Sequence, residues 1–206
     1  MTLTTLTSAA QRIVQQALQH FANRGYDAAS LNDIAVSAGI KKASLYAHFT
    51  GKDELYTQVL NLALESEWAF VDAQFSTANS DAVPGSRYVD NLEGRFSNSD
   101  TLRFLLRAAY YPPATVEQKV KSGFENYLAG IGERFEALLK QAFPEVDSAR
   151  SRLLAEAYLA LIDSLHVELI HGNARRYARR LNALCQLIEI VGLPTFVGAG
   201  PSESDN

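Results

Sequence analysis

The feature that most constrains the fold is Gly39, which joins two short segments with helical patterns. In LNDIAVSAGIKKASLYAHFTGKDEL, residues 31–55, apolar side chains recur at helical spacing before this glycine and again after it. A glycine at such a junction ends one helix and lets the chain turn into the next. An upstream segment, residues 8–25, carries an apolar face of its own. Three helices around a glycine turn have the anatomy of a helix-turn-helix unit.

Capping residues predict where these helices begin and end. A Ser or Thr followed three residues later by an acid or amide can satisfy the free N–H groups of a first turn. The pairs that fit are Ser8 with Gln11, Ser30 with Asp33, and Thr50 with Asp53. Gly25 is expected to end the first helix. The third helix is predicted over 41–48, and a long fourth helix over 50–77.

The rest of the chain continues the helical pattern. A turn-rich linker over 77–86 is followed by apolar periodicity that predicts helices over 87–96, 100–111, 115–143, 147–171 and 174–191. The sequence therefore predicts an all-α protein. We expect an N-terminal helix-turn-helix DNA-binding domain over 1–51, a larger helical ligand-binding and dimerisation domain over 52–194, and a loose tail over 195–206.

Composition limits the compartment and the class of partner. A single cysteine, Cys185, excludes an intramolecular disulfide framework. No stretch has the pattern of a secretory signal or is apolar enough to span a bilayer, so we expect a cytoplasmic protein with no membrane contact. The net charge is −4, but residues 1–60 hold five Lys and Arg against four acids. A basic surface would therefore depend on where individual residues lie.

The segment after Gly39 has the side chains that a DNA-reading helix needs. At about 100° per residue, Lys42, Ala43 and Tyr46 share a face opposite Leu45 and Phe49. Cations and hydroxyl groups hold phosphates, and side chains near the helix start reach base edges. The candidate DNA contacts are Ser30, Lys41, Lys42, Ala43, Ser44, Tyr46, His48 and Lys52. Other interpretations remain open: the two lysines could be solvated, Tyr46 could lie at the core edge, and His48 could bond at a helix end.

This region resembles the DNA-binding region of the tetracycline-repressor (TetR/AcrR) family of bacterial transcriptional regulators. The resemblance covers about fifty residues. It lies in the motifs Ile34-Ala35, Ala38-Gly39-Ile40, Leu45-Tyr46, His48-Phe49 and Lys52-Asp53-Glu54-Leu55, with Phe21, Gly25 and Tyr26 upstream. Lys41 departs from the family pattern, which places Ser or Thr there to cap the recognition helix. Lysine cannot accept a bond from a backbone N–H, so about 1 kcal/mol of capping is expected to be missing.

The resemblance implies a repressor that binds an inverted-repeat, double-stranded operator as a homodimer and is released by a small-molecule effector. It implies pairing of the last two long helices with their mates. Their apolar stripes are Leu154, Tyr158, Leu161, Leu165 and Leu169, and then Leu181, Leu184, Leu187, Ile188 and Val191. The same stripes could instead be intramolecular core.

The implied effector site lies among the middle helices, where aromatic side chains are frequent. The candidate ligand contacts are Trp68, Phe104, Arg107, Tyr110, Tyr111, Phe124, Tyr127, Tyr158 and His166. Aromatic residues at helical spacing are more often core, and Arg107 could equally be a solvated surface residue. Gly123, Gly130 and Gly132, inside one predicted helix, are expected to serve close packing, a bend or ligand access.

Other classes of function have weaker support in the sequence. Asp163 and His166 are three residues apart, but no HExxH motif or cysteine pair accompanies them, so we expect no metal site. Neither a nucleophile elbow, a phosphate loop nor a dinucleotide fingerprint is present, so we expect no enzyme activity and no cofactor. The remaining alternative is a small-molecule-binding or interaction protein without DNA function. The basic cluster at 175–180 is expected to be a solvated face or to pair with acids.

Overall fold

A computed structural model describes residues 6–76 and 83–190, and this part of the chain folds into nine helices with no strand. The predicted all-α class is confirmed. The helices are α1 (Ser8–Ala28), α2 (Leu31–Ser37), α3 (Lys42–Leu45), α4 (Lys52–Gln74), α5 (Ser86–Asn98), α6 (Asp100–Tyr110), α7 (Glu117–Ala142), α8 (Ser148–His171) and α9 (Ala174–Ile190). Among these residues, no helix is both long and apolar enough to cross a membrane.

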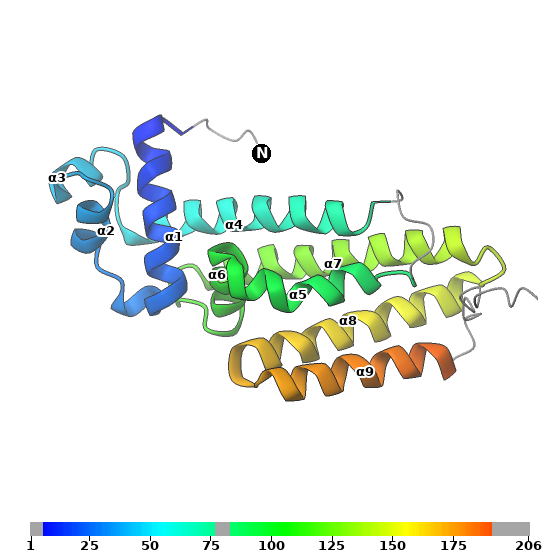
Figure 1. Ribbon diagram of the computed structural model, residues 1–206. Coiled ribbons are helices and arrows are strands. Elements are labelled where there is room, and N and C mark those ends of the chain that lie inside the picture. Colours follow the sequence, from blue (N-terminus) through cyan, green and yellow to red (C-terminus); the bar gives the residue numbers. More distant parts are fainter. Residues whose placement is uncertain (1–5, 77–82, 191–206) are drawn as a thin grey trace, which may run out of the picture.

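The helices form a small body at one end and a longer body beside it. Figure 1 shows α1, α2 and α3 grouped at one end, with α4 running from that group along α7. α8 and α9 form an antiparallel pair on the far side of α7. With 23 residues, α4 is about 34 Å long, enough to contact both bodies.

The helix ends follow local chemistry, with two changes from prediction. The cap of α1 is Thr7, whose hydroxyl accepts from the backbone N–H of Ala10 at 3.3 Å, and not Ser8. The cap of α2 is Ser30, as predicted, accepting from the N–H groups of Asn32 and Asp33. Gly25 breaks the helical geometry of α1 at φ 77°, three residues before the assigned end of the helix.

The start of α4 is fixed by Thr50 and Glu54, not by Thr50 and Asp53. The backbone N–H and the hydroxyl of Thr50 donate to Oε2 of Glu54 at 2.6 and 2.7 Å. These bonds lower the pKa of the Glu54 carboxyl group. Asp53 instead accepts a hydrogen bond from the hydroxyl of Tyr26, which ties α4 to the end of α1.

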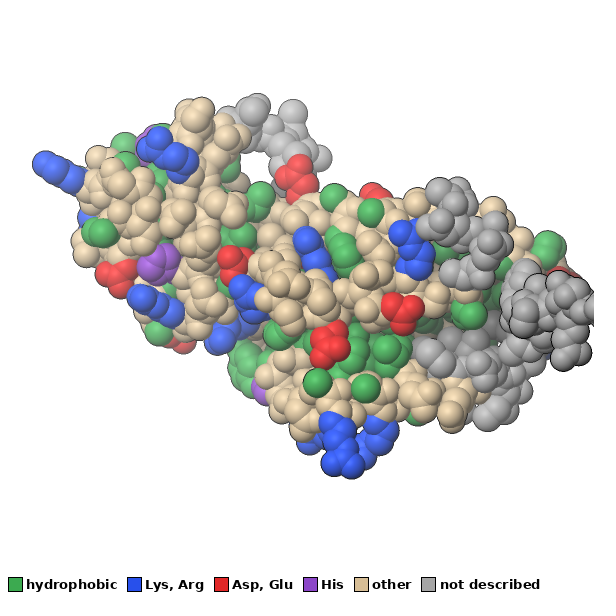
Figure 2. Space-filling model, in the orientation of Figure 1, with side chains coloured by type: hydrophobic (Ala, Val, Ile, Leu, Met, Phe, Trp, Pro, Cys, Tyr) green, Lys and Arg blue, Asp and Glu red, His purple; other side chains and the backbone are tan. Residues whose placement is uncertain are grey.

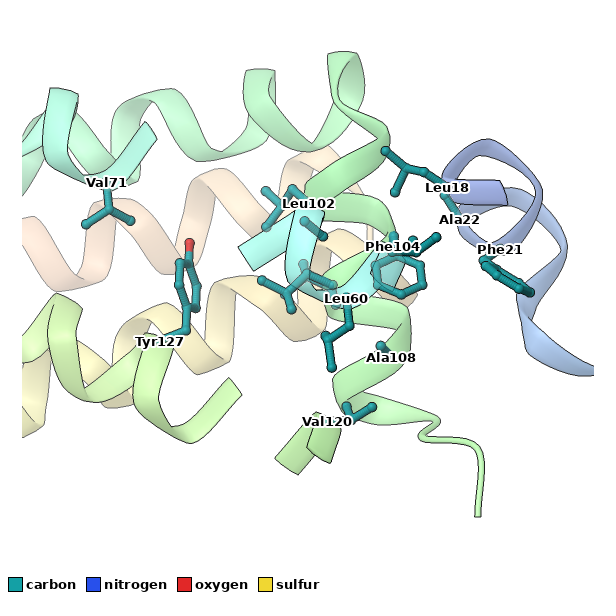
Figure 3. Close-up of a cluster of buried hydrophobic side chains, with 14 of the residues drawn as sticks. Leu18, Phe21, Ala22, Leu60, Val71, Leu102, Phe104, Ala108, Val120 and Tyr127 are labelled. Carbon is teal, nitrogen blue, oxygen red and sulfur yellow. The ribbon is translucent and has the colours of Figure 1, made fainter. Parts of the chain in front are cut away.

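One continuous core runs through both bodies. Figure 3 shows Phe21 of α1 beside Phe104 of α6, with further buried side chains extending along α4 and α7. The rings of Phe21 and Phe104 lie 6.4 Å apart, and Tyr56 of α4 lies 5.0 Å from Phe104. α1 packs against both α4 and α6. The predicted boundary after residue 51 separates two regions that share this core.

Close packing surrounds all three glycines of α7. A Cβ on Gly130 would lie 2.1 Å from the ring of Trp68, and a Cβ on Gly123 or Gly132 would lie 3.0 Å from the side chain of Leu64 or Leu159. Real Cβ atoms do not approach the ring of a neighbour to 2.1 Å, so Gly130 lets α4 and α7 approach each other.

A carboxylate lies inside the larger body. Glu67 of α4 is fully buried and pairs with Arg95 of α5 at 2.9 Å. The hydroxyl of Thr101 also donates to Glu67. These bonds offset the cost of taking the charge out of water. Nothing in the sequence marks Glu67 as buried, because an acid within a helix usually lies on its solvated face.

Candidate nucleic-acid interface

The angle between α2 and α3 is set by the backbone at Gly39. Gly39 has φ 72°, and its N–H donates to the carbonyl of Val36 at 3.0 Å. The N–H of Ile40 donates to the carbonyl of Ala35 at 3.0 Å. This pair of bonds is a Schellman motif, which ends α2 and turns the chain toward α3. The glycine is needed because other residues strongly resist a positive φ.

The segment after Gly39 presents one face outward and anchors the other. Leu45 and Phe49 are buried, while Lys42 and Ala43 are exposed. Tyr46 keeps 50% of its surface exposed although it is a large aromatic residue. The side chains that the sequence assigned to a DNA-facing surface therefore lie outside the protomer core.

The recognition segment is a shorter α-helix than predicted. α3 covers four residues and is continued to residue 48 by turns, in which the N–H groups of Ala47 and His48 donate to the carbonyls three residues earlier. Lys41 stands at the helix start with no side-chain cap bond, in agreement with the departure noted in the sequence. Lys41, Ser44 and His48 are exposed.

Lys52, a predicted phosphate contact, lies against the end of α1. Its ammonium group donates to the carbonyl of Asp27 at 3.3 Å and lies 4.5 Å from the centre of the Tyr26 ring. This bond uses one of the three N–H donors of the ammonium group. Ser30, the other predicted phosphate contact beside a helix start, uses its hydroxyl oxygen to cap α2.

Basic side chains are spread over the visible surface and are grouped at two places on it. Figure 2 shows one group over the α1–α3 end and another over α9. Two of the arginines of α9, Arg176 and Arg180, pair with the buried Glu168 at 2.9 and 2.7 Å. Pairing with an acid, one of the two interpretations of this cluster from the sequence, is therefore confirmed for these two arginines.

Four of the nine predicted ligand contacts lie together. Trp68 of α4 is 5.6 Å from Tyr127 of α7, ring centre to ring centre, and Phe124 is 6.1 Å from both Tyr127 and His166 of α8. We call these four residues the aromatic cluster. Burial lowers the pKa of His166 to about 3, so its ring is neutral at neutral pH. Neither ring nitrogen has a hydrogen-bond partner among the described residues.

The other five predicted ligand contacts lie elsewhere. Phe104 belongs to the core between the two bodies. Tyr158 stacks on Phe135 at 4.2 Å and donates to the carbonyl of Gly85 at 2.8 Å. Arg107 and Tyr111 line a cleft between the bodies, and the hydroxyl of Tyr110 lies 3.5 Å from the carbonyl of Asp163.

The apolar stripe of α8 faces the protomer's own core. Leu154, Tyr158, Leu161 and Leu165 are buried within this single chain, so they are not free to pair with a second copy. Leu169 is partly buried against the same core. In α9, Leu181 is also partly buried, whereas the side chains of Leu184, Leu187 and Ile188 and all of Val191 lie outside the described residues.

The described part of the chain offers no group of three His, Cys, Asp or Glu side chains that could hold a metal ion. Asp163 is exposed and His166 is fully buried, so the two residues do not share a surface.

Comparison with known proteins agrees with this geometry. The family model described as "Bacterial regulatory proteins, tetR family" matches residues 13–59. The negative transcriptional regulator IcaR of the biofilm operon icaADBC, from Staphylococcus aureus, is 49% identical over 47 residues, which are 23% of this chain. The matched region spans only about a quarter of that relative, 25% of its length.

Solved structures match over most of the chain. A TetR family transcriptional regulator from Agrobacterium tumefaciens has a TM-score of 0.65 at 22% identity, covering 87% of this chain and 97% of that one. The multidrug binding protein EbrR, complexed with imidazole, has a TM-score of 0.60 at 21% identity, covering 88% and 95%. At these identities the match concerns the fold. The match to the tetR family of bacterial regulatory proteins therefore lies in residues 13–59, and the rest of the chain shares the fold of these structures.

Proposed function

We propose that this protein is a transcriptional repressor that binds an inverted-repeat operator as a dimer and is released by a small-molecule effector. The observation that carries the proposal is the outward face of residues 42–46, which presents Lys42, Ala43 and Tyr46 while Leu45 anchors the segment from behind. A helix held in this way can enter a major groove. The name of IcaR, a negative regulator, supports repression.

The DNA contacts fall into two chemical groups. Lys41 and Lys42 supply charge for phosphates, and Ser44 and His48 supply hydrogen bonds. Ala43 and Tyr46 meet base edges or methyl groups near the helix start. Ser30 holds the start of α2 toward the phosphate backbone of the DNA. Lys52 reaches a phosphate after leaving Asp27.

The dimer uses the last two long helices, through a different surface from the predicted leucine stripe. The side of α8 that faces away from the core carries Leu153 and Val167, which are 69% and 36% exposed, with Ala157 and Ala160 between them. Small and apolar residues at this spacing allow close helix packing between subunits.

The effector binds at the aromatic cluster. Trp68, Phe124 and Tyr127 supply apolar contact, and His166 supplies one donor and one acceptor that the described residues leave unpaired. A buried, unpaired ring is costly, so a ligand that pairs with it gains affinity. The effector would act by binding more tightly to the state that does not bind DNA. The solved complex of EbrR with imidazole is a precedent within this fold.

A gel-shift assay on the promoter beside the protein's own gene tests DNA binding. Wild type should bind, and Lys42→Ala and Tyr46→Ala should bind more weakly. Lys121→Ala is the matched control, because Lys121 is an exposed lysine of α7 paired with Glu117. If wild type selects no sequence from the promoter or from a random duplex library, the alternative of a ligand-binding or interaction protein without DNA function is preferred.

A further inference from the structure

A cleft of about 610 Å³ lies between the end of α1 and the segment that follows α6. One side is formed by residues 24–28 and the other by residues 111–115, with Tyr56 and Arg107 also in its lining. The cleft therefore lies between the small body and the large one. None of the four residues of the aromatic cluster lines it.

Arg107 lies in the last turn of α6 and faces the end of α1. Its Nε donates to the carbonyl of Ala22 at 3.1 Å, and Nη1 lies 3.3 Å from where a Cβ on Gly25 would be. Gly25 thus makes room for the guanidinium group. Within the described part of the chain, Nη1 and Nη2 have no hydrogen-bond partner, and the side chain is exposed. Several N–H donors therefore remain available at the cleft.

The cleft lining contains two other charged residues, Arg24 and Asp27, and neither is a cation that lacks an acid partner among the described residues. Arg24 is paired with Asp33 at 3.1 Å. Asp27 is an exposed acid, and only its backbone carbonyl accepts from Lys52, at 3.3 Å. Arg107 is therefore the cation in the cleft lining that has unused donors and no acid partner among the described residues.

The uncharged walls are flat and largely apolar. Tyr56 is buried at the inner side, where its ring lies 5.3 Å from that of Tyr26 in an edge arrangement. Pro112, Pro113 and the half-exposed Tyr111 form the opposite wall. Aromatic rings and prolines provide rigid surfaces for a planar apolar group.

We propose that this cleft is a second ligand site, and that it takes a small aromatic carboxylate. The carboxylate would pair with the free guanidinium nitrogens of Arg107, whose planar fork matches a carboxylate in two parallel hydrogen bonds. The ring would lie between the tyrosines and the prolines. A ligand held here contacts α1 and α6 at once and links the two bodies. The site does not depend on DNA binding, so its test stands whether or not the proposed function holds.

The experiment uses the full chain and ¹⁹F NMR with three probes of one shape: 4-fluorobenzoate, 4-fluorobenzamide and 4-fluorobenzylamine. We expect the benzoate to bind and the neutral amide to bind about tenfold more weakly or worse, because a hydrogen bond to a charged group is worth more than a neutral one. Tighter binding of the benzylamine would mean that Asp27 dominates the cleft and would overturn the proposal.

Arg107→Gln should reduce benzoate affinity by about tenfold or more, and Arg107→Lys should fall between it and wild type. Arg175→Gln, at an exposed arginine of α9, is the matched control and should bind as wild type does. If Arg107→Gln does not fold, Tyr111→Ala, which removes an exposed side chain from the wall, should weaken binding in its place.

Fluorescence of Trp68, the single tryptophan of the chain, separates the two sites. Binding in the cleft should leave its emission unchanged, because Trp68 does not line the cleft. Benzoate binding that quenches Trp68 and survives Arg107→Gln would assign the ligand to the aromatic cluster and overturn the proposal. So would the absence of benzoate binding to wild type at millimolar concentration.

Discussion

The ring of Trp68 in α4 lies directly over Gly130 in α7, where a Cβ on residue 130 would come within 2.1 Å of a ring carbon. The guanidinium group of Arg134, which donates to the carbonyl of Gly130 at 3.0 Å, lies 4.6 Å from the centre of the Trp68 ring and pairs with Asp72. The indole thus packs against a glycine that gives it room and a cation that is hydrogen-bonded to the same glycine. This contact fixes the separation of the two helices that carry the aromatic cluster.

Gly130→Ala should therefore lower the free energy of unfolding by about 1–3 kcal/mol, because the added methyl group forces Trp68 to move. Gly94→Ala is the matched control: Gly94 lies inside α5, and a Cβ there meets no atom within 4 Å. That change should stabilise the protein by about 0.5–1 kcal/mol. Urea unfolding measures both. Equal effects of the two substitutions would contradict the packing argument.

Glu67→Gln should destabilise the protein by about 1–3 kcal/mol, because it removes the charged acceptor of Arg95 and Thr101, while Arg95, with 24% of its side chain exposed, stays partly solvated. Glu136→Gln breaks a pair with Lys140 in which both side chains reach solvent, and should cost less than about 1 kcal/mol. Chemical unfolding of both variants at neutral pH gives the comparison. A cost for Glu67→Gln as small as that of Glu136→Gln would show that the buried charge is not important for stability.

His166 should make the protein sensitive to acid. Burial lowers the pKa of its ring from 6.5 to about 3, so between these values the unfolded chain binds a proton that the folded chain does not. The free energy of unfolding should therefore fall by about 1.4 kcal/mol per pH unit as pH drops through this window, and above pH 6.5 the contribution vanishes.

The measurement is urea unfolding from pH 7 to pH 4 for wild type and His166→Gln. The variant should lose stability less steeply with falling pH. His48→Gln, at an exposed position, is the matched control. Parallel curves for wild type and His166→Gln would contradict the prediction.

Lys42→Ala should reduce the slope of log affinity against log salt by about one unit, since each phosphate contact releases about one counterion. Because Lys42 is exposed, the unfolding free energy should change little. Operator binding measured at several salt concentrations tests this, with Lys121→Ala as the lysine that should leave the slope unaltered.

Lys52→Ala should also lower the salt slope by about one unit and weaken binding across sequences if the side chain leaves Tyr26 to reach a phosphate. The same titration decides this, together with thermal unfolding. An unchanged slope with a lower melting temperature would show that Lys52 only braces α1 against α4.

Sequence reasoning succeeded where local chemistry decides the outcome. The glycine turn at residue 39, the Ser30 cap and the burial of Leu45 and Phe49 follow from neighbours a few residues apart. Prediction from the sequence was less reliable where two neighbouring residues can both cap the same helix start. Thr7 caps α1 in place of Ser8, and Glu54 replaces Asp53 because Asp53 is taken by the distant Tyr26.

Tertiary partners could not be read from spacing. The stripe on α8 is apolar whether it meets its own core or a second copy, and here Leu154, Leu161 and Leu165 meet the core. For the same reason, only some of the predicted ligand contacts lie in the aromatic cluster, and the others lie elsewhere in the fold. Tyr158 and Tyr127 look alike in sequence, but one packs on Phe135 and the other lies beside Trp68.

The junction of α1 with α6 has a consequence for engineering. Phe21 packs near Phe104, and the carbonyl of Ala22 accepts a hydrogen bond from Arg107. The α1–α3 body is therefore completed by side chains that lie more than 80 residues later in the chain. A hybrid protein that combines the α1–α3 body of this chain with the larger body of a relative would need a compatible aromatic residue and a cation on the α6 of that relative. The identity of two positions in one short helix should therefore decide which small and large bodies can be exchanged.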